Sequence, residues 1–380
     1  MRLAFFNNSL NHHQVNVADE LYKLLGDDYV YITTVASVQI RLKGGANYNT
    51  RPYCLCAGDS AASKEKALEY ARNAEVCVFG ASSLEYAVER AKFNDKALSF
   101  ELSERWLKRG LLNLLSPHLI KWWLTYLNYF RNANFYKLNS SAYGAMDHYR
   151  MFSYRNRCYK WGYFTKVESD FKVEAPELGA STSEITPLMW CARFLKLKHP
   201  ELPVQLAHRL KQKGCNFVID MYGDGVELDN SKRLANTLHV DDVVFFKGNL
   251  PNQDILEAMR NHKIFLFTSD RHEGWGAVAN EAMSNGCVLV GSDAIGSVPY
   301  LIKHGVNGLI FQSGNIDSLE KQVEYLLDNP ENCFKMRKEA VMTMQHIWSP
   351  VCAAKNLLTL IEDLQNGRES SVNEGPGSKA

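Results

Sequence analysis

Short apolar runs alternate with amphipathic helical patterns along most of this chain, and this alternation limits the folds that the chain can adopt. The first half shows it in a series of runs and helical patterns at 2–8, 15–26, 30–35, 63–74, 75–82, 83–94 and 97–102. The second half repeats the same order from 186 to 329. Strands that alternate with helices of this length indicate βαβ units and a mostly parallel sheet. We therefore predict an α/β fold with two doubly wound, Rossmann-like domains in series.

The chain is long enough for two separate cores. It has 380 residues, of which 46% are hydrophobic, and single domains mostly run to about 100–200 residues. A polar stretch at 165–186 has no sustained period and predicts the boundary. We expect an N-terminal domain over 1–172, a linker over 173–187 and a C-terminal domain over 188–344. The tail at 367–380 has almost nothing to bury and is predicted to be disordered.

Charge and hydropathy exclude several classes of protein. The 43 basic and 42 acidic residues leave a net charge of +1, so no global electrostatic footprint for a nucleic-acid partner exists. No apolar stretch approaches the roughly 20 residues that span a bilayer, and the first residues hold too short an apolar run for a signal peptide. A cytoplasmic protein is expected, with the inner face of the cell membrane as the alternative location. The nine cysteines are scattered, and most lie in apolar contexts typical of buried reduced thiols.

The segment 106–135 combines aromatic and basic residues. Its members are Trp106, Trp122, Trp123, Tyr126, Tyr129 and Phe130, interleaved with Lys108, Arg109, Lys121 and Arg131. We expect two helices, broken at Pro117, that pack their aromatic side chains into the first domain. A peripheral membrane contact is the alternative, because this composition also suits a membrane interface.

Loops at the carboxyl ends of the predicted strands are the expected ligand site, since ligands of open α/β sheets bind there. Arg193 and Lys198 follow the first strand of the second half. They could clamp a diphosphate, one by a planar fork and the other as a point charge. The turn of Gly274, Trp275 and Gly276 can bring backbone amides against a ligand where larger side chains would block the approach.

Two glutamates flank that turn. Glu273 precedes it, and Glu281 lies in the helix that follows. Glu281 can accept hydrogen bonds from the vicinal hydroxyls of a ribose, and Glu273 can do the same for a second sugar. Two cations for phosphate and two carboxylates for hydroxyls suit a nucleotide sugar. Two further loops supply candidate donor contacts at Gly223, Asp224, Asn249 and Leu250. Asp224 could equally cap the turn that follows it.

Glu273-x7-Glu281, followed by AMSNGCVLVGSDAIGSVPYLIKHGVNGLIF, closely resembles the signature region of retaining glycosyltransferases of family 4, which have the GT-B fold. The resemblance extends back through ARFLKLK, YGDG and VVFFKGNL, and covers about residues 186–330 in the correct order. A glutamate pair at this spacing is a weak signal by itself. The ordered set is specific.

The resemblance implies a role for each matched residue. Glu281 would bind the nucleotide ribose, Glu273 the hydroxyls of the donor sugar, and Arg193 and Lys198 the diphosphate. The reaction implied is transfer with retention by front-face attack, in a cleft between the two domains and without a metal ion. A helix over about 345–366 would cross back onto the N-terminal domain.

The resemblance also implies the substrates. The co-substrate would be a nucleotide-sugar donor, a UDP-sugar first and a GDP-sugar as the alternative, and no further cofactor is expected. The acceptor would be a glycan or a lipid-linked saccharide, in the assembly of bacterial capsule, exopolysaccharide or lipopolysaccharide.

The N-terminal domain departs from the family pattern. Its first loop reads NNSLNHHQ where a glycine-rich loop is common, so contacts with acceptor or donor sugar would come from Asn11, His12 or His13. SFELSER stands where many members have a histidine, which makes Glu101, Ser103 or Glu104 the candidate helper. His199 also replaces a common glycine after Lys198.

Two other functions are compatible with the same residues. A nucleotide-sugar epimerase on this architecture would consume the donor without an acceptor. A non-catalytic nucleotide-binding module would bind without turnover. An NAD-dependent dehydrogenase is disfavoured because no Gly-x-Gly-x-x-Gly follows the first strand.

Overall fold

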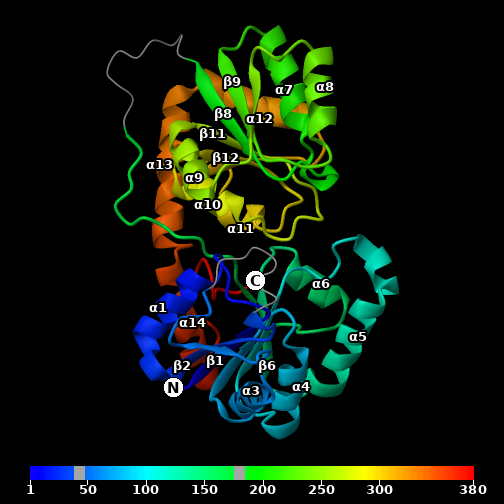
Figure 1. The fold of residues 1–380 in the computed structure, drawn as a ribbon, viewed down its shortest axis with the longest axis vertical. Helices are drawn as coiled ribbons and strands as arrows, with labels where there is room; N and C mark the ends of the chain where they lie inside the picture. The colour runs from blue at the N-terminus through cyan, green and yellow to red at the C-terminus, as the bar shows by residue number, and fades with distance from the viewer. Residues whose placement is uncertain (38–47, 175–184) are drawn as a thin grey trace. The chain divides into compact units, whose positions relative to one another are not determined.

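The computed structural model describes residues 1–37, 48–174 and 185–380, which form two compact units (Figure 1). The first unit is Met1–Lys166 together with Ile347–Ala380, and the second is Val167–His346. Most of the linker predicted at 173–187 lies outside the described residues. No helix among those described is long and apolar enough to cross a membrane.

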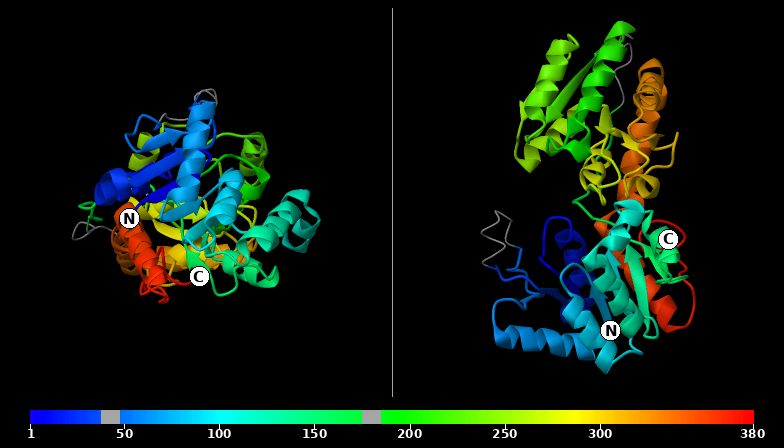
Figure 2. Two further views of the ribbon diagram at one scale, coloured as in Figure 1. Left: turned by 90° about the horizontal axis from the view of Figure 1, so that it is seen from below. Right: turned by 90° about the vertical axis from the view of Figure 1, so that its right-hand side faces the viewer.

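The first unit contains a seven-stranded parallel sheet in the order β3-β2-β1-β4-β5-β6-β7. Its strands are β1 Leu3–Asn7, β2 Tyr29–Thr33, β3 Cys54–Cys56, β4 Val76–Phe79, β5 Ser99–Ser103, β6 Phe135–Asn139 and β7 Cys158–Lys160. All residues of β1, β2 and β4 are buried, because helices cover both faces of a doubly wound sheet (Figure 2).

The helices of the first unit follow the strands in a βαβ succession. They are α1 Val15–Leu25, α3 Ala61–Asn73, α4 Leu84–Phe93, α5 Pro117–Thr125, α6 Gly144–Arg150 and α14 Pro350–Gln365. The last of these packs against α1 and begins at Ser349, whose hydroxyl accepts from the amide of Cys352. The helix expected over about 345–366 is therefore part of the first unit.

The second unit contains a six-stranded parallel sheet in the order β10-β9-β8-β11-β12-β13. Its strands are β8 Thr186–Cys191, β9 Phe217–Tyr222, β10 Val244–Gly248, β11 Ile264–Phe267, β12 Val288–Ser292 and β13 Gly308–Phe311. Its helices are α7 Glu201–Gln212, α8 Leu228–Thr237, α9 Asn252–Asn261, α10 Val278–Ser284, α11 Val298–Leu301, α12 Ile316–Asp328 and α13 Pro330–His346.

Both sheets therefore have the Rossmann strand order, with one extra strand in the first. The order reverses between β1 and β4 in the first unit and between β8 and β11 in the second. At such a reversal the helices on either side lie on opposite faces of the sheet, which leaves a crevice at the carboxyl ends of the two strands. These two positions are where a ligand site is expected.

The tail at 367–380, predicted to be disordered, is ordered in the structure. The amides of Gly377 and Ala380 donate to the carbonyls of Lys160 and Cys158, and Lys160 donates to the carbonyl of Ser378. The prediction was wrong because composition measures only what the tail itself can bury. It does not show that β7 is an edge strand with unpaired backbone groups, which the tail satisfies.

Candidate functional site

The loops after β8 and β11 meet at the strand-order reversal of the second sheet. Ile264 of β11 pairs with Leu188 of β8, so the segments that follow the two strands emerge side by side. The first carries Arg193 and Lys198, and the second carries Glu273. Residues predicted from motifs 75 positions apart are thus brought to the same edge of the sheet.

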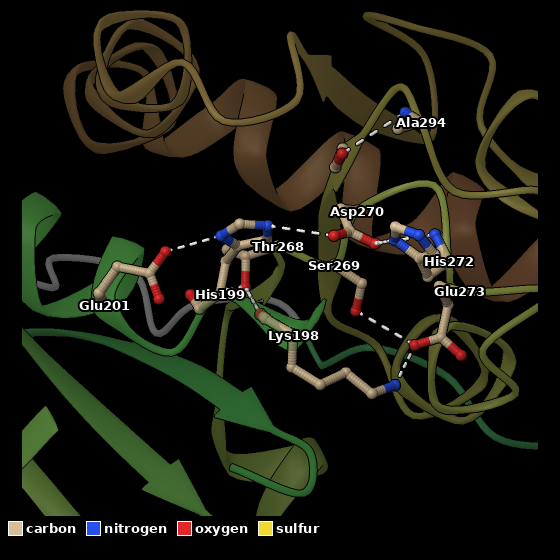
Figure 3. Close-up of polar contacts among 10 residues, drawn as sticks. Lys198, His199, Glu201, Thr268, Ser269, Asp270, His272, Glu273 and Ala294 are labelled. Carbon is tan, nitrogen blue, oxygen red and sulfur yellow. Dashed lines mark hydrogen bonds and ion pairs between the residues drawn. The ribbon is translucent and has the colours of Figure 1, made fainter. Parts of the chain in front are cut away.

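Lys198 and Glu273 form an ion pair at this edge (Figure 3). The Lys198 ammonium contacts Oε2 of Glu273, and the Ser269 hydroxyl donates to the same oxygen at 3.2 Å. Each of the two charged side chains is only 14% exposed. A half-buried cation held this way is preorganised, since its position is set before any ligand arrives.

A chain of hydrogen bonds fixes the backbone beneath the ion pair. The Trp190 indole donates to the Thr268 hydroxyl at 2.9 Å, and that hydroxyl donates to the carbonyl of Lys198 at 2.7 Å. Trp190 is buried in β8. The loop after β8 is therefore held to the end of β11 by groups that belong to the core.

His199, which stands where the family commonly has glycine, adopts a left-handed backbone with φ of 49°. Left-handed backbone is costly for a side chain other than glycine. The imidazole lies between Glu201, 2.6 Å from Nδ1, and Asp270, 3.6 Å from Nε2 (Figure 3). The hydrogen bond to Glu201 raises the pKa of His199. These two carboxylates offset part of the backbone cost by stabilising the protonated ring.

The YGDG turn lies directly against the loop that carries Arg193. Gly223 has φ of 124°, and a Cβ there would lie 2.0 Å from the carbonyl oxygen of Ala192, so only glycine fits. The amide of Gly223 donates to the carbonyl of Gly248 at 2.8 Å. The loops after β8, β9 and β10 therefore form one connected frame.

Four predicted donor contacts are exposed on this frame: Arg193, Asp224, Asn249 and Leu250. Asp224 accepts a hydrogen bond from the amide of Gly225 at 2.7 Å, so it does stabilise the turn. Its carboxylate nevertheless remains on the surface beside the Arg193 loop.

The Gly274, Trp275 and Gly276 turn is fixed by the core beneath it. Trp275 is fully buried, its indole donates to Asn280 at 2.8 Å, and its carbonyl accepts from the Ser297 hydroxyl at 2.5 Å. Gly276 has φ of 74°, and a Cβ there would lie 2.3 Å from the Phe267 ring. The tryptophan side chain thus anchors the turn, and what the turn can offer a ligand is its backbone.

Glu281 lies in the first turn of α10. Burial raises the pKa of its carboxyl to about 7, although a hydrogen bond with Asn252 acts in the opposite direction. A half-buried carboxylate that lacks enough donors gains when hydroxyl groups bind to it. Glu281 therefore has the properties expected of a group that accepts from a pair of vicinal hydroxyls.

A polar pocket of about 380 Å³ lies in the first unit, at the reversal between β1 and β4. Its lining residues are Asn7, Asn8, Asn11, His13, Gln14, Gly80, Ala81, Leu102, Ser103, Glu104, Trp122, Ser140 and Tyr163. Four of the five predicted N-terminal candidates other than Glu101, namely Asn11, His13, Ser103 and Glu104, are among them. His12 is exposed and lies outside this lining.

The pocket holds one side-chain network that combines a ring, a phenol and a carboxylate. The His13 ring stacks on Tyr163 with centroids 5.4 Å apart, and the Tyr163 hydroxyl donates to Glu104 at 2.8 Å. Lys108 pairs with the other oxygen of Glu104. Burial, followed by the neighbouring His12, lowers the pKa of His13 to about 4, so this ring is neutral at pH 7.

Glu101, predicted as a catalytic helper, is buried beneath the pocket and does not line it. Its carboxylate forms an ion pair with the buried ammonium of Lys137, which also donates to the Ser103 hydroxyl at 2.6 Å. Glu101 of β5 and Lys137 of β6 are opposite each other in the strand register. A role in direct contact with a ligand is therefore corrected to a structural role below the site.

Several lining residues were not predicted, among them Asn7, Gly80, Ser140 and Tyr163. The first three lie at or just after the carboxyl ends of β1, β4 and β6. The carboxyl-end rule, applied to every strand of the first half, would have found them. Tyr163 follows the edge strand β7 and carries no comparable signal.

Residues 186–341 match the family model described as glycosyl transferases group 1. The matched stretch lies within the second unit, Val167–His346, and we call it the group 1 domain. The match begins at the first residue of β8 and ends within α13, so the group 1 domain contains the whole frame of loops described above. Among the described residues, no group of three or more His, Cys, Asp or Glu side chains is placed to hold a metal ion.

Curated relatives match about two fifths of this chain. N-acetyl-alpha-D-glucosaminyl L-malate synthase of Bacillus anthracis is 30% identical over 155 residues, 41% of this chain and 39% of that protein. Lipopolysaccharide 1,6-galactosyltransferase of Escherichia coli K12 is 26% identical over 156 residues, 40% of this chain and 42% of that protein. The chain thus matches about two fifths of the length of these relatives.

Solved structures match both units and show the GT-B fold. HepE of Anabaena, solved in complex with UDP, superposes with a TM-score of 0.69 at 15% identity, over 96% of this chain and 100% of that chain. The lipopolysaccharide outer core galactosyltransferase WaaB superposes with a TM-score of 0.67 at 14% identity, over 94% and 98%. At such identities the likeness establishes the architecture alone, and it agrees with the fold predicted from the sequence.

Proposed function

We propose that this protein is a retaining glycosyltransferase that transfers a hexose from a nucleotide-diphosphate sugar to a glycan or lipid-linked saccharide. The observation that carries the proposal is the pairing of Lys198 with Glu273 at the strand-order reversal of the group 1 domain. It supports the proposal because an ammonium lies beside a carboxylate, and in the proposed function the first contacts the diphosphate and the second the hydroxyls of the sugar.

Donor binding would use each feature of the frame in turn. Glu281 accepts from the ribose hydroxyls, and the backbone of the Gly274 to Gly276 turn approaches the diphosphate. Arg193 and Lys198 neutralise its charge. Because HepE has been solved with UDP and with UDP-glucose, a UDP-sugar is the first donor to test, and a GDP-sugar is the second.

The chemical step would proceed by front-face attack. The acceptor hydroxyl forms a bond to the anomeric carbon while the bond from that carbon to the diphosphate oxygen breaks, and its electron pair leaves with the diphosphate. The acceptor proton passes to a phosphate oxygen on the same face. Lys198 and Arg193 stabilise the charge that develops on the leaving group, while Glu273 holds the sugar hydroxyls.

The polar pocket of the first unit would take the acceptor. Its asparagines and serines can donate and accept hydrogen bonds, as sugar hydroxyls require. His13 is neutral, so its ring nitrogens can accept as well as donate, and Glu104 is a charged acceptor held by Tyr163. Such a neutral polar lining with one carboxylate suits an uncharged saccharide better than an anionic one.

Transfer can be tested by incubating the full chain with UDP-glucose, UDP-galactose, UDP-N-acetylglucosamine or GDP-mannose and an octyl glycoside as acceptor. Mass spectrometry should detect a product one sugar larger, and NMR should show the anomeric configuration of the donor. Conversion of the donor into another sugar nucleotide would identify an epimerase instead. Nucleotide binding with no change in any donor would support a non-catalytic module.

A further inference from the structure

Helix α5 is apolar on both of its faces. Leu119 is buried, and Trp122 and Trp123 are half-buried against Trp106 and Met151. On the solvent-exposed part of the helix, Ile120 is 44% exposed and Leu124 is 47% exposed. These two residues are four positions apart and so share one side of the helix. A surface helix of a globular protein normally shows polar residues on the side away from the core.

The exposed apolar surface extends through the turn that precedes α5. In the 3-10 helix Gly110–Leu115, the leucines at 111, 112, 114 and 115 are all exposed, Leu115 by 79%. We call the exposed apolar residues Leu111, Leu112, Leu114, Leu115, Ile120 and Leu124 the 111–124 surface. Scattered exposed apolar residues are normal, whereas a contiguous set marks an interaction site.

Helix α6 continues this surface. The Trp123 indole of α5 donates to the carbonyl of Met151, just after α6, at 2.9 Å, and exposed Met146, Tyr149 and Phe152 lie along that segment. Figures 1 and 2 show α5 at the rim of the first unit, and Figure 1 shows α6 beside it. The expectation that the aromatic residues of 106–135 pack inward fits Trp106, Tyr126 and Phe130, which are buried, but not Tyr129, which is 38% exposed.

The charged residues within 105–146 are all of one sign. Between Glu104 and Asp147 the sequence contains no acidic residue. Exposed cations occur within this stretch and along the α6 segment, at Arg109, Lys121, Arg131, Arg150 and Arg155. An apolar centre within a basic rim is complementary to the surface of a bilayer that contains anionic lipids, where the rim meets headgroups and the leucines enter the acyl boundary.

We propose that the 111–124 surface docks the protein on an anionic lipid bilayer. Trp122 belongs to the same helix and lines the polar pocket of the first unit, so docking brings the mouth of that pocket to the lipid headgroups. If the pocket takes the acceptor, a step that rests on the proposed function, the acceptor is a lipid-linked saccharide presented at the bilayer surface.

Co-sedimentation of the full chain with vesicles tests the docking surface directly. Vesicles of phosphatidylcholine alone are compared with vesicles that also contain phosphatidylglycerol. We expect binding to the second kind, weakened by added salt, because the basic rim acts through screened charge. Leu124→Asp should reduce the affinity more than about tenfold, because it places a carboxylate where apolar surface enters the bilayer.

Matched variants distinguish a loss of vesicle binding that is specific to this surface from a general effect of added negative charge. Leu24, on α1 of the same unit, is 47% exposed, as Leu124 is, so Leu24→Asp adds the same charge to an equally exposed helical leucine. Lys121→Glu is compared in the same way with Lys66→Glu on α3, since both lysines are exposed. The account expects Leu24→Asp and Lys66→Glu to bind the vesicles nearly as wild type does.

Three outcomes would overturn the proposal. They are no binding to anionic vesicles, an equal loss in the matched variants, and concentration-dependent self-association that Leu124→Asp abolishes, which would make this face an interface between copies of the chain. Thermal unfolding without vesicles or nucleotide checks that each variant is folded. Thermal stabilisation by UDP, measured separately, distinguishes failure of the docking surface from failure of the proposed function.

Discussion

Glu281 is the residue whose environment makes the sharpest pH-dependent prediction. Its pKa in the folded protein is about 7, against an ordinary value of 4.5. Ribose hydroxyls donate to the ionised carboxylate, so nucleotide affinity should rise as the pH passes upward through about 7. Isothermal titration calorimetry with UDP should show this rise in wild type. Glu281→Gln should bind UDP more weakly, and its affinity should not rise with pH in this way. An identical rise in the variant would contradict the role of Glu281 at the ribose.

The same carboxyl should make the folded state less stable as the pH rises. Between about 4.5 and 7 the unfolded chain has lost this proton while the folded chain retains it. Each unit by which the pKa of the folded state exceeds that of the unfolded state lowers the free energy of unfolding at neutral pH by about 1.4 kcal/mol. The total loss is on the order of 3 kcal/mol. Urea unfolding of wild type and Glu281→Gln should therefore diverge from acid to neutral pH, the variant being the more stable at neutral pH.

Glu273 should affect turnover more than nucleotide affinity. Its carboxylate holds sugar hydroxyls in the proposed function and not the nucleotide, so Glu273→Gln should lower the rate of transfer about 100-fold with UDP affinity nearly unchanged. Steady-state kinetics and UDP titration check the two effects separately. The control is Glu257→Gln, an exposed glutamate of α9, which should change neither. A large loss of UDP affinity in Glu273→Gln would place this residue at the nucleotide instead.

Site residues could be predicted where the signal for them lies within a short stretch of sequence. Arg193, Lys198, Glu273 and Glu281 each follow a strand within a short motif, and the structure brings Lys198 and Glu273 into contact. Glu101 has no such signal. Its burial depends on Lys137 being opposite it in the next strand, and strand register between distant segments cannot be read from one strand.

At the scale of the elements, one buried arginine caps the carboxyl end of a helix. Arg90 of α4 is fully buried and donates to the carbonyls of Ala71, Ala74 and Glu75, at 3.1, 2.6 and 3.1 Å. These groups lie at the carboxyl end of α3, where the last carbonyls have no partner within the helix. Burial lowers the pKa of Arg90, and these acceptors compensate for the loss of water.

Arg90→Met should therefore destabilise the first unit by about 2–4 kcal/mol, because it leaves buried carbonyls without donors. Arg72, one helix away, pairs with Glu65 and Glu89 and is 29% exposed. Arg72→Met should cost less than about 1 kcal/mol, as partly exposed ion pairs do. Chemical denaturation measures both. Equal effects would show that the contacts of Arg90 with α3 contribute little.

The elements themselves were the most predictable part of the chain. Apolar runs became parallel strands in Rossmann order because their hydrophobic pattern is continuous and their connections are short. What covers the sheet edge and the exposed helix surfaces was not predictable. The order of the tail at 367–380 comes from the free backbone of β7, and the exposure of the 111–124 surface depends on which side of α5 meets the core.

At the scale of the whole molecule, the two units contribute different parts of the proposed reaction. The group 1 domain carries the donor frame, and the first unit carries the polar pocket and the 111–124 surface. The family match lies in the second unit, so acceptor choice is the part of the proposed function that similarity informs least. For acceptor choice the evidence is therefore the lining of the pocket and the 111–124 surface.

Thermal unfolding with UDP, GDP and ADP, in wild type and Glu281→Ala, tests the central claim most directly. A ligand at about 100 times its dissociation constant adds roughly 2.7 kcal/mol to the stability of the unit that binds it, and should raise the midpoint by about 5–11 °C. The account predicts stabilisation by one nucleoside diphosphate, UDP first, and its loss in Glu281→Ala. No shift with any of the three, or an equal shift in the variant, would contradict the donor site on which the proposed function depends.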